Sequence, residues 1–315
     1  MTNKIIKLLF TLFVPLSLFG ASGVEFFVVN GSAEKVFNTY INNDIENIGF
    51  ILSDPHERVN DAYAQKYPPT DLENLGFFSI SNDEALRPLL LKEPSLGGFN
   101  PFNLHIYKVK SEDKTYIGHV TPTTMLDITN VKDVAVREAF VEMFNPLDKQ
   151  IQSTFETTKQ VMTYKNLPAK TMMEFTYTFD RPDDISAFVE TFQEDFEATM
   201  EKSHYLIAGY KDFKETYEDL ELPFEKYDAY FVYSLCHMNF SYSIFKDRPD
   251  AGVFAPCSMY MYIEKDTNVM HIGMPYLANW AAVMNITDPK KLKAVKELDT
   301  EIVSVLESMN AKLVK

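Results

Sequence analysis

A long internal repeat constrains the fold of this chain more than any other sequence feature. The segments FNPFNLHIYKVKSEDKTYIG (99–118) and FAPCSMYMYIEKDTNVMHIG (254–273) align without a gap at an offset of 155 residues. The identical pairs include Pro94 and Pro249, Gly97 and Gly252, Pro101 and Pro256, Tyr107 and Tyr262, and Gly118 and Gly273. A period of this length is too long for a solenoid. We therefore predict two tandem copies of one domain in the chain of 315 residues.

Both copies predict a similar order of strands and helices. In the first copy, strands are expected at 24–29, 49–53, 76–81, 102–110 and 114–120, and helices after a cap at Ser32 and at 56–67, 82–92 and 131–154. In the second, strands are expected at 172–179, 229–237, 257–264 and 268–274, and helices at 185–202, capped by Asp183 or Asp184, and from Asp288–Pro289 to about residue 313. This pattern indicates an α+β domain with a mainly antiparallel sheet and helices on one face. We place the first copy at 24–160 and the second at 168–315, with the boundary near 155–168.

The N-terminus predicts export from the cytoplasm. Two lysines precede an apolar run from Leu8 to Phe19, and small residues follow it. This layout is typical of a signal peptide, and the run is shorter than the ~20 residues of a membrane span. We predict a signal peptide at 1–23, cut between Gly20 and Val24, and a protein that is periplasmic or secreted, without stable membrane insertion after cleavage.

Composition narrows the classes of partner. The formal net charge is −15, and an acidic surface repels the phosphate backbone of nucleic acids. We therefore expect no nucleic acid as a partner. The expected partners are a small ligand and, within the chain, the other copy of the repeat.

The repeated motif resembles that of the domain-of-unknown-function family 302. The second copy carries the matching residues Cys236, Pro249, Gly252, Pro256, Cys257, Tyr262 and Glu264. The first copy keeps Pro94, Gly97, Pro101 and Tyr107, but Ser81 and Phe102 stand where the second has its cysteines. The resemblance implies a β-α-β(4)-α arrangement similar to the TATA-binding-protein fold. It also implies a mostly bacterial origin, hence the periplasm, and it brings no established activity.

The segment CHMNFSYSIFKDRPDAGVFAPCSMYMY (236–262) contains both cysteines and several methionines. Strand alternation puts Cys257, Met259 and Met261 on one face, and Met270, Ile272 and Met274 on one face of the next strand, opposite His271. Three interpretations stay open. The sulfur side chains pack a core, or Cys236 and Cys257 form a disulfide or thiol pair, or a soft-metal site for copper forms. The metal set would be Cys257, Met259, Met261, Met238 and Met274, with His237 or His271 at its rim.

No segment has the spacing of a known catalytic site, so catalytic residues stay unknown and an enzyme is the less favoured interpretation. We expect a soluble periplasmic protein that acts as a non-catalytic small-ligand or interaction module, without a cofactor. The alternative is a thiol redox or copper-binding protein that uses Cys236, Cys257 and the nearby methionines. The two copies are expected to pair with each other, and a sheet continuous across both would indicate pairing edge to edge.

Overall fold

The N-terminal half of the chain forms a six-stranded antiparallel sheet with the order β2-β3-β4-β5-β1-β6. The computed structural model describes residues 20–314. The elements of this half are β1 (Ala21–Asn30), α1 (Glu34–Asn43), η1 (Ile45–Ile48), β2 (Ile51–His56), α2 (Val59–Lys66), β3 (Leu72–Ser81), α3 (Asp83–Leu90), η2 (Pro94–Phe99), β4 (Phe102–Val109), β5 (Lys114–Val120), α4 (Pro122–Ile128), α5 (Val134–Phe155) and β6 (Thr158–Tyr164).

The C-terminal half forms a second six-stranded antiparallel sheet with the order β12-β7-β11-β10-β9-β8. Its elements are β7 (Met172–Thr178), α6 (Ile185–Lys202), β8 (Leu206–Asp212), α7 (Phe213–Asp219), β9 (Tyr227–Cys236), α8 (Met238–Phe245), η3 (Pro249–Phe254), β10 (Cys257–Glu264), β11 (Val269–Pro275), α9 (Ala278–Val283), α10 (Pro289–Ser308) and β12 (Lys312–Leu313). Each of these elements has a counterpart at the same place in the first sheet or around it. The fold is α+β, with one β-α-β unit repeated in each half.

Capping explains where several helices begin. The Asp184 carboxylate accepts the Ala187 N–H at the start of α6, and the Asp288 carboxylate accepts the N–H groups of Lys290 and Lys291 at the start of α10. Both caps confirm the sequence prediction. Ser32, by contrast, does not cap α1, whose N-cap residue is Ala33 and has no side-chain cap.

The sequence pattern did not predict several short strands and helices. The strands β6, β8 and β12 and the helices α4, α7, α8 and α9 were not expected, and β6 lies inside the region 155–168 that was expected to be a boundary. These elements have two to eight residues, too few for a clear period. The last helix also ends at Ser308 rather than near residue 313.

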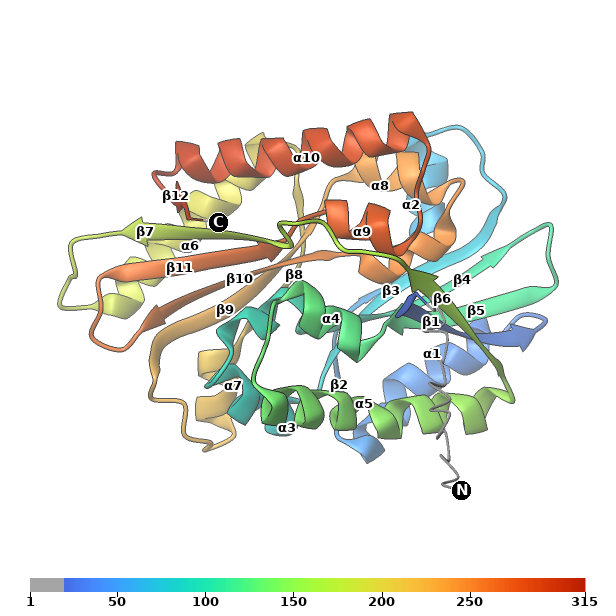
Figure 1. Cartoon of the computed structure of the whole chain (residues 1–315), viewed down its shortest axis with the longest axis horizontal. Helices are drawn as coiled ribbons and strands as arrows, with labels where there is room; N and C mark the ends of the chain where they lie inside the picture. The colour runs from blue at the N-terminus through green and yellow to red at the C-terminus, as the bar shows by residue number, and fades with distance from the viewer. Residues whose placement is uncertain (1–19, 315) are drawn as a thin grey trace, which may run out of the picture.

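Each sheet has its long helices on one face and the other half of the molecule on the opposite face. In the first half, Phe37 of α1 packs on Phe78 and Phe144 of α5 packs on Phe102. On the opposite face, Phe77 packs on Phe245 of α8 in the second half. Figure 1 shows α5 and α10 on opposite sides of the molecule, with the sheets between them.

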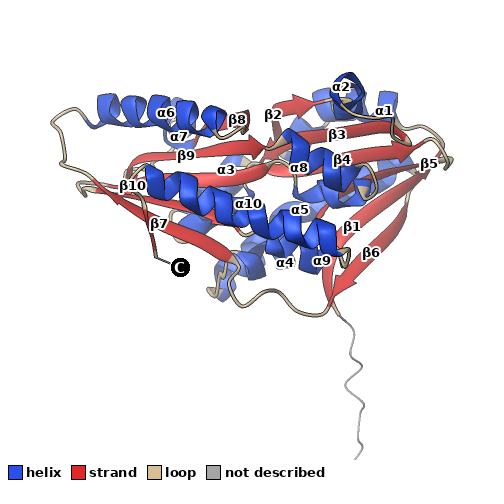
Figure 2. Cartoon of the chain, turned by 90° about the horizontal axis from the view of Figure 1, so that it is seen from above, coloured by secondary structure: helices blue, strands red, loops and turns tan. Residues whose placement is uncertain are grey.

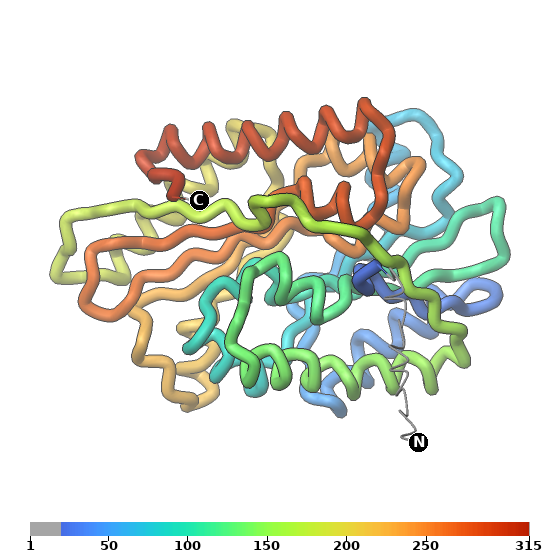
Figure 3. The backbone as a smooth tube through the Cα atoms, viewed as in Figure 1, coloured from blue at the N-terminus to red at the C-terminus, as the bar shows by residue number. Residues whose placement is uncertain are grey.

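The two sheets stay separate although their edge strands are neighbours. Strands β2 and β8 lie side by side in Figure 2, and the His56 Nε2 atom lies 2.5 Å from the Ala208 carbonyl oxygen. The strand pairings of residues 20–314 nevertheless divide into two sheets, so the continuous sheet considered above does not form. Figure 3 traces the connection (165–171) from β6 into β7. Between residues 20 and 314, no helix combines the length and the apolar composition needed to span a bilayer.

Candidate functional site

The repeated motif docks each half onto the sheet of the other. A Cβ atom added to Gly97 in η2 would lie 2.7 Å from the Tyr260 Cβ atom of β10. A Cβ atom added to Gly252 in η3 would lie 2.5 Å from the His105 Cε1 atom of β4. His105 and Tyr260 are themselves equivalent at the offset of 155. The two glycines therefore permit the same close approach in both directions.

Hydrogen bonds hold both motif prolines to the opposite sheet. The Tyr230 hydroxyl donates to the Pro94 carbonyl oxygen at 2.5 Å, and the His105 Nε2 atom lies 2.8 Å from the Pro249 carbonyl oxygen. The two acceptors are equivalent at the offset of 155, whereas the side chains that face them, Tyr230 and His105, are not. The prolines and glycines that were interpreted as fold motif thus form the interface between the halves.

The repeated tyrosines lie on the same faces as these docking sites. Tyr107 stacks on Tyr116 with ring centroids 4.7 Å apart, and Tyr262 stacks on His271 at 4.8 Å. Tyr107 also stacks on His105, and Tyr262 on Tyr260. The tyrosines therefore support the aromatic side chains that receive the opposite motif.

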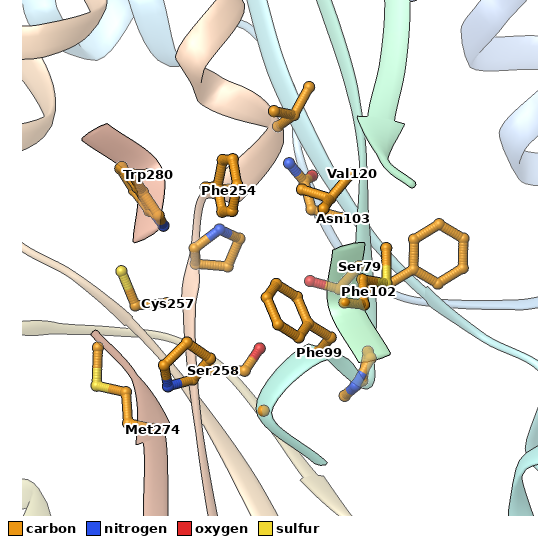
Figure 4. Close-up of a pocket in the computed structure, with 16 residues that line it drawn as sticks. Ser79, Phe99, Phe102, Asn103, Val120, Phe254, Cys257, Ser258, Met274 and Trp280 are labelled. Atoms are coloured by element: carbon orange, nitrogen blue, oxygen red, sulfur yellow. The ribbon is translucent and has the colours of Figure 1, made fainter. Parts of the chain in front are cut away.

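A small cavity of about 30 Å³ lies between the halves where the two motifs meet. Its lining residues are mostly pairs at the offset of 155: Gly98 and Val253, Phe99 and Phe254, Pro101 and Pro256, Phe102 and Cys257, Asn103 and Ser258, Val120 and Pro275, and Met125 and Trp280. Figure 4 shows Cys257 between Trp280 and Met274 on one side of this cavity and Phe102 with Asn103 on the other. Cys257 thus stands at the interface of the two halves, where the first half has a phenylalanine.

A second cavity, of about 20 Å³, brings both cysteines together. We call it the sulfur cavity, and its lining includes Cys236, Cys257, Met274, Tyr205 and His237. Cys257 pairs with Leu235 in the β9–β10 ladder, so Cys236 is one residue out of register on the neighbouring strand. Both cysteines are free thiols.

Burial sets the electrostatics of the sulfur cavity. It raises the pKa of the Cys257 thiol far above its ordinary value, and the neighbouring Cys236 and Asp299 raise it further. Burial also raises the pKa of Cys236, against a hydrogen bond from Ser241 that lowers it. Such thiols stay protonated and are weak nucleophiles. The Tyr205 hydroxyl is buried at this cavity and has no hydrogen-bond partner within residues 20–314.

The other residues proposed from the sequence as metal ligands lie in different places. Met259 and Met261 are fully buried on the same face as Cys257 but line neither cavity. Met238 begins α8, where the His237 ring accepts the Phe240 N–H as the N-cap. His271 stacks on Tyr262 across the sheet from the sulfur side chains. The structure therefore brings together Cys236, Cys257 and Met274, with His237 at the rim, and separates His271 from them.

A charge cluster around the buried His119 in the first half was missed from the sequence. It consists of Glu25 (β1), His119 (β5), Asp148 (α5) and Lys159 (β6). The His119 Nε2 atom lies 2.9 Å from Asp148 Oδ1, and the Lys159 ammonium lies 2.5 Å from Glu25 Oε2 and 3.6 Å from Asp148 Oδ2. The one available signal was that Glu25 and His119 occupy inward-facing positions of otherwise apolar strands.

Burial opposes charge on His119, Asp148 and Lys159, but the attraction of their charged neighbours outweighs it. The pKa of His119 and that of Lys159 are raised above their ordinary values by the neighbouring carboxylates. The pKa of Asp148 is lowered by His119 and Lys159. His119 and His105, although on adjacent strands, face opposite sides of the sheet, because Gly118 is the residue that pairs with His105.

A comparison with known protein families finds a match in the second half of the chain. Residues 184–309 match the model of the domain of unknown function DUF302. A solved structure, the uncharacterized conserved protein DUF302 from Bacillus stearothermophilus, is 16% identical, covers 42% of this chain and 95% of its own, and has a TM-score of 0.35. No curated protein matches the chain. The C-terminal half of this chain contains a domain of the DUF302 family.

Proposed function

We propose that this protein is an exported, non-catalytic binding protein that holds one soft metal ion, Cu(I), in the sulfur cavity. The observation that carries the proposal is the convergence of Cys236, Cys257 and Met274 on one cavity. Thiolate and thioether sulfur are the donors that select Cu(I). A cavity of about 20 Å³ is about the size of one water molecule, which suits a single ion better than an organic ligand.

The raised thiol pKa values fit binding better than catalysis. A protonated, buried thiol does not attack a substrate at neutral pH. A bound metal ion, by contrast, displaces the thiol proton, so metal binding and proton release are coupled. The sulfur cavity is therefore expected to act as a site that becomes charged only when the ion enters.

A disulfide between Cys236 and Cys257 is the second candidate for this site. Neighbouring strands lie about 5 Å apart and successive residues rise about 3.4 Å, so the two Cα atoms fall within the roughly 7 Å that a disulfide tolerates. Because successive residues of a strand alternate in face, the bond also requires Cys236, the last residue of β9, to turn its side chain towards Cys257. An oxidising compartment would favour this bond. It would make the pair a structural bridge or a thiol redox site rather than a metal site.

Export and a second family domain complete the proposal. The signal peptide proposed for 1–23 lies largely outside the described residues. A cut directly after Gly20 would leave β1 complete, because Ala21 and Ser22 pair with Tyr164 and Thr163 of β6.

The common element order and sheet order of the two halves support a DUF302-like origin for the first half as well.

Native mass spectrometry of the reduced protein under anaerobic conditions, with Cu(I) added, tests the function. We expect one copper per chain, loss of that copper in Cys257→Ser, and retention in Met259→Leu, which changes a buried sulfur outside the cavity. A spectrum without copper at any addition would contradict the proposal and favour an interaction module. Alkylation of the denatured, unreduced protein tests the alternative, because a disulfide leaves both thiols unlabelled.

A further inference from the structure

We propose that Glu25, His119 and Asp148 form a divalent-cation site in the first half, in which the Lys159 ammonium occupies the position of the cation until a metal displaces it. This site uses nitrogen and oxygen donors and is independent of the sulfur cavity. Its class of ligand is a borderline divalent ion such as Zn²⁺, which imidazole and carboxylate groups bind.

Geometry provides the first support. One ligand atom from each of the three side chains lies within 4.8 Å of the others. Among residues 20–314 this is the one such group of His, Cys, Asp or Glu side chains. The three residues come from a central strand, a neighbouring strand and the helix that covers them, so their separations are fixed by the sheet and by α5.

The orientation of His119 is the second support. Its Nδ1 atom lies 2.8 Å from the Val120 carbonyl oxygen, which can only accept a hydrogen bond, so Nδ1 carries a proton. The Nε2 atom is thereby directed at Asp148. A backbone carbonyl that fixes one ring nitrogen while the other faces the ligands is the usual arrangement of a metal-binding histidine.

Charge balance is the third support. The Lys159 ammonium lies 2.5 Å from Glu25 Oε2 and 3.6 Å from Asp148 Oδ2, so a positive group already stands between the two carboxylates. A divalent ion that takes this place keeps both carboxylates paired with positive charge, so neither is left without a counter-ion when Lys159 moves away.

The exposure of Lys159 makes the exchange feasible. Its side chain is 35% exposed, whereas that of His119 is 0% exposed. Lys159 lies on β6, the edge strand of its sheet, and lysine carries its charge on a flexible stem. It can therefore move into solvent while the three ligands stay in place.

An unpaired hydroxyl beside the cluster is an independent feature. Tyr40 of α1 is 1% exposed, and its hydroxyl has no hydrogen-bond partner within residues 20–314. Burial raises the pKa of Tyr40, and the Asp44 and Asp148 carboxylates raise it further.

Calorimetric titration with Zn²⁺ tests the site in the full chain carrying Cys236→Ser and Cys257→Ser, so that sulfur does not contribute. We expect Lys159→Gln to tighten Zn²⁺ binding at least about tenfold, because it removes the competing positive charge. The matched control is Lys149→Gln, which removes an exposed lysine next to Asp148 but outside the cluster and should leave the affinity unchanged.

Adding His119→Gln to Lys159→Gln should abolish the binding, and the His119 imidazole NMR signals of the Lys159→Gln chain should shift when Zn²⁺ is added. Circular dichroism of each variant checks that the fold is intact. The site is refuted if Lys159→Gln binds Zn²⁺ no more tightly than Lys149→Gln, or if the His119→Gln variant binds equally well. In either case the cluster is a closed charge network.

Discussion

The two halves share one topology but differ in chemistry at the place beneath their last long helix. In the first half, Glu25 pairs with His119 across β1 and β5, and in the second, Met173 pairs with Met274 across β7 and β11. At the offset of 155, Asp148 corresponds to Val303. The place beneath the last long helix therefore holds a charge cluster in the first half and methionine side chains in the second.

This difference shows which residues recur in the two halves and which do not. The prolines and glycines that dock the halves recur, and the aromatic side chains beneath them form similar stacks. The residues beneath α5 and α10 do not recur, because packing there requires only that the volume be filled and the polar groups be satisfied. The interface maintains the architecture, and the two interiors carry side chains of different chemistry.

The largest loss of stability is expected when the docking glycines Gly97 and Gly252 are replaced. Gly252→Val and Gly97→Val should each reduce the free energy of unfolding by at least about 3 kcal/mol, because the added side chain overlaps His105 or Tyr260. Chemical denaturation measures both, and the two losses should be similar because the interface is reciprocal. If either variant unfolds like the natural chain, the docking contact is not required.

The next effect is a dependence on pH that comes from His105, at a position where the second half has Tyr260. Burial lowers the pKa of His105 to about 4, although the Gly76 and Pro249 carbonyls oppose this. The unfolded chain binds the proton from about pH 6.5 downwards and the folded chain does not, so stability is full above pH 6.5 and falls as the pH drops towards 4, by up to about 3 kcal/mol.

Denaturation at several pH values tests this asymmetry between the halves. His105→Gln should remove this part of the acid destabilisation. Tyr260→Phe, at the equivalent position of the second half, should keep it. Identical pH profiles for the natural chain and His105→Gln would contradict the assignment to His105.

A smaller loss is expected when the charge cluster is broken. Asp148→Asn removes the carboxylate that faces both His119 and Lys159, and it should reduce the free energy of unfolding by about 2 kcal/mol. It should also lower the pKa of His119, because burial is then less opposed. An NMR titration of His119 together with denaturation measures both changes, and an unchanged pKa would show that Asp148 does not stabilise the imidazolium.

The smallest loss of stability is expected when a buried methionine outside the cavities is replaced. Met259→Leu conserves volume in an apolar core and should cost no more than about 1 kcal/mol. Thermal unfolding measures it against Met274→Leu, which lines both cavities. If Met259→Leu also abolishes copper binding, the metal site extends along β10, and the sulfur cavity as defined is too small.

The sequence alone determined the repeat, the α+β class, the long helices and most central strands, because these depend on local periodicity and on identities at a fixed offset. It also put Cys257, Met259 and Met261 on one face of a strand. Only the tertiary structure decided that each Pro-x-x-Gly motif docks on the opposite half, that Cys236 and Cys257 line one cavity, and that Glu25, His119, Asp148 and Lys159 meet. Those contacts join residues far apart in the chain, and a sequence pattern of period two or 3.6 carries no information about which distant face an element will meet.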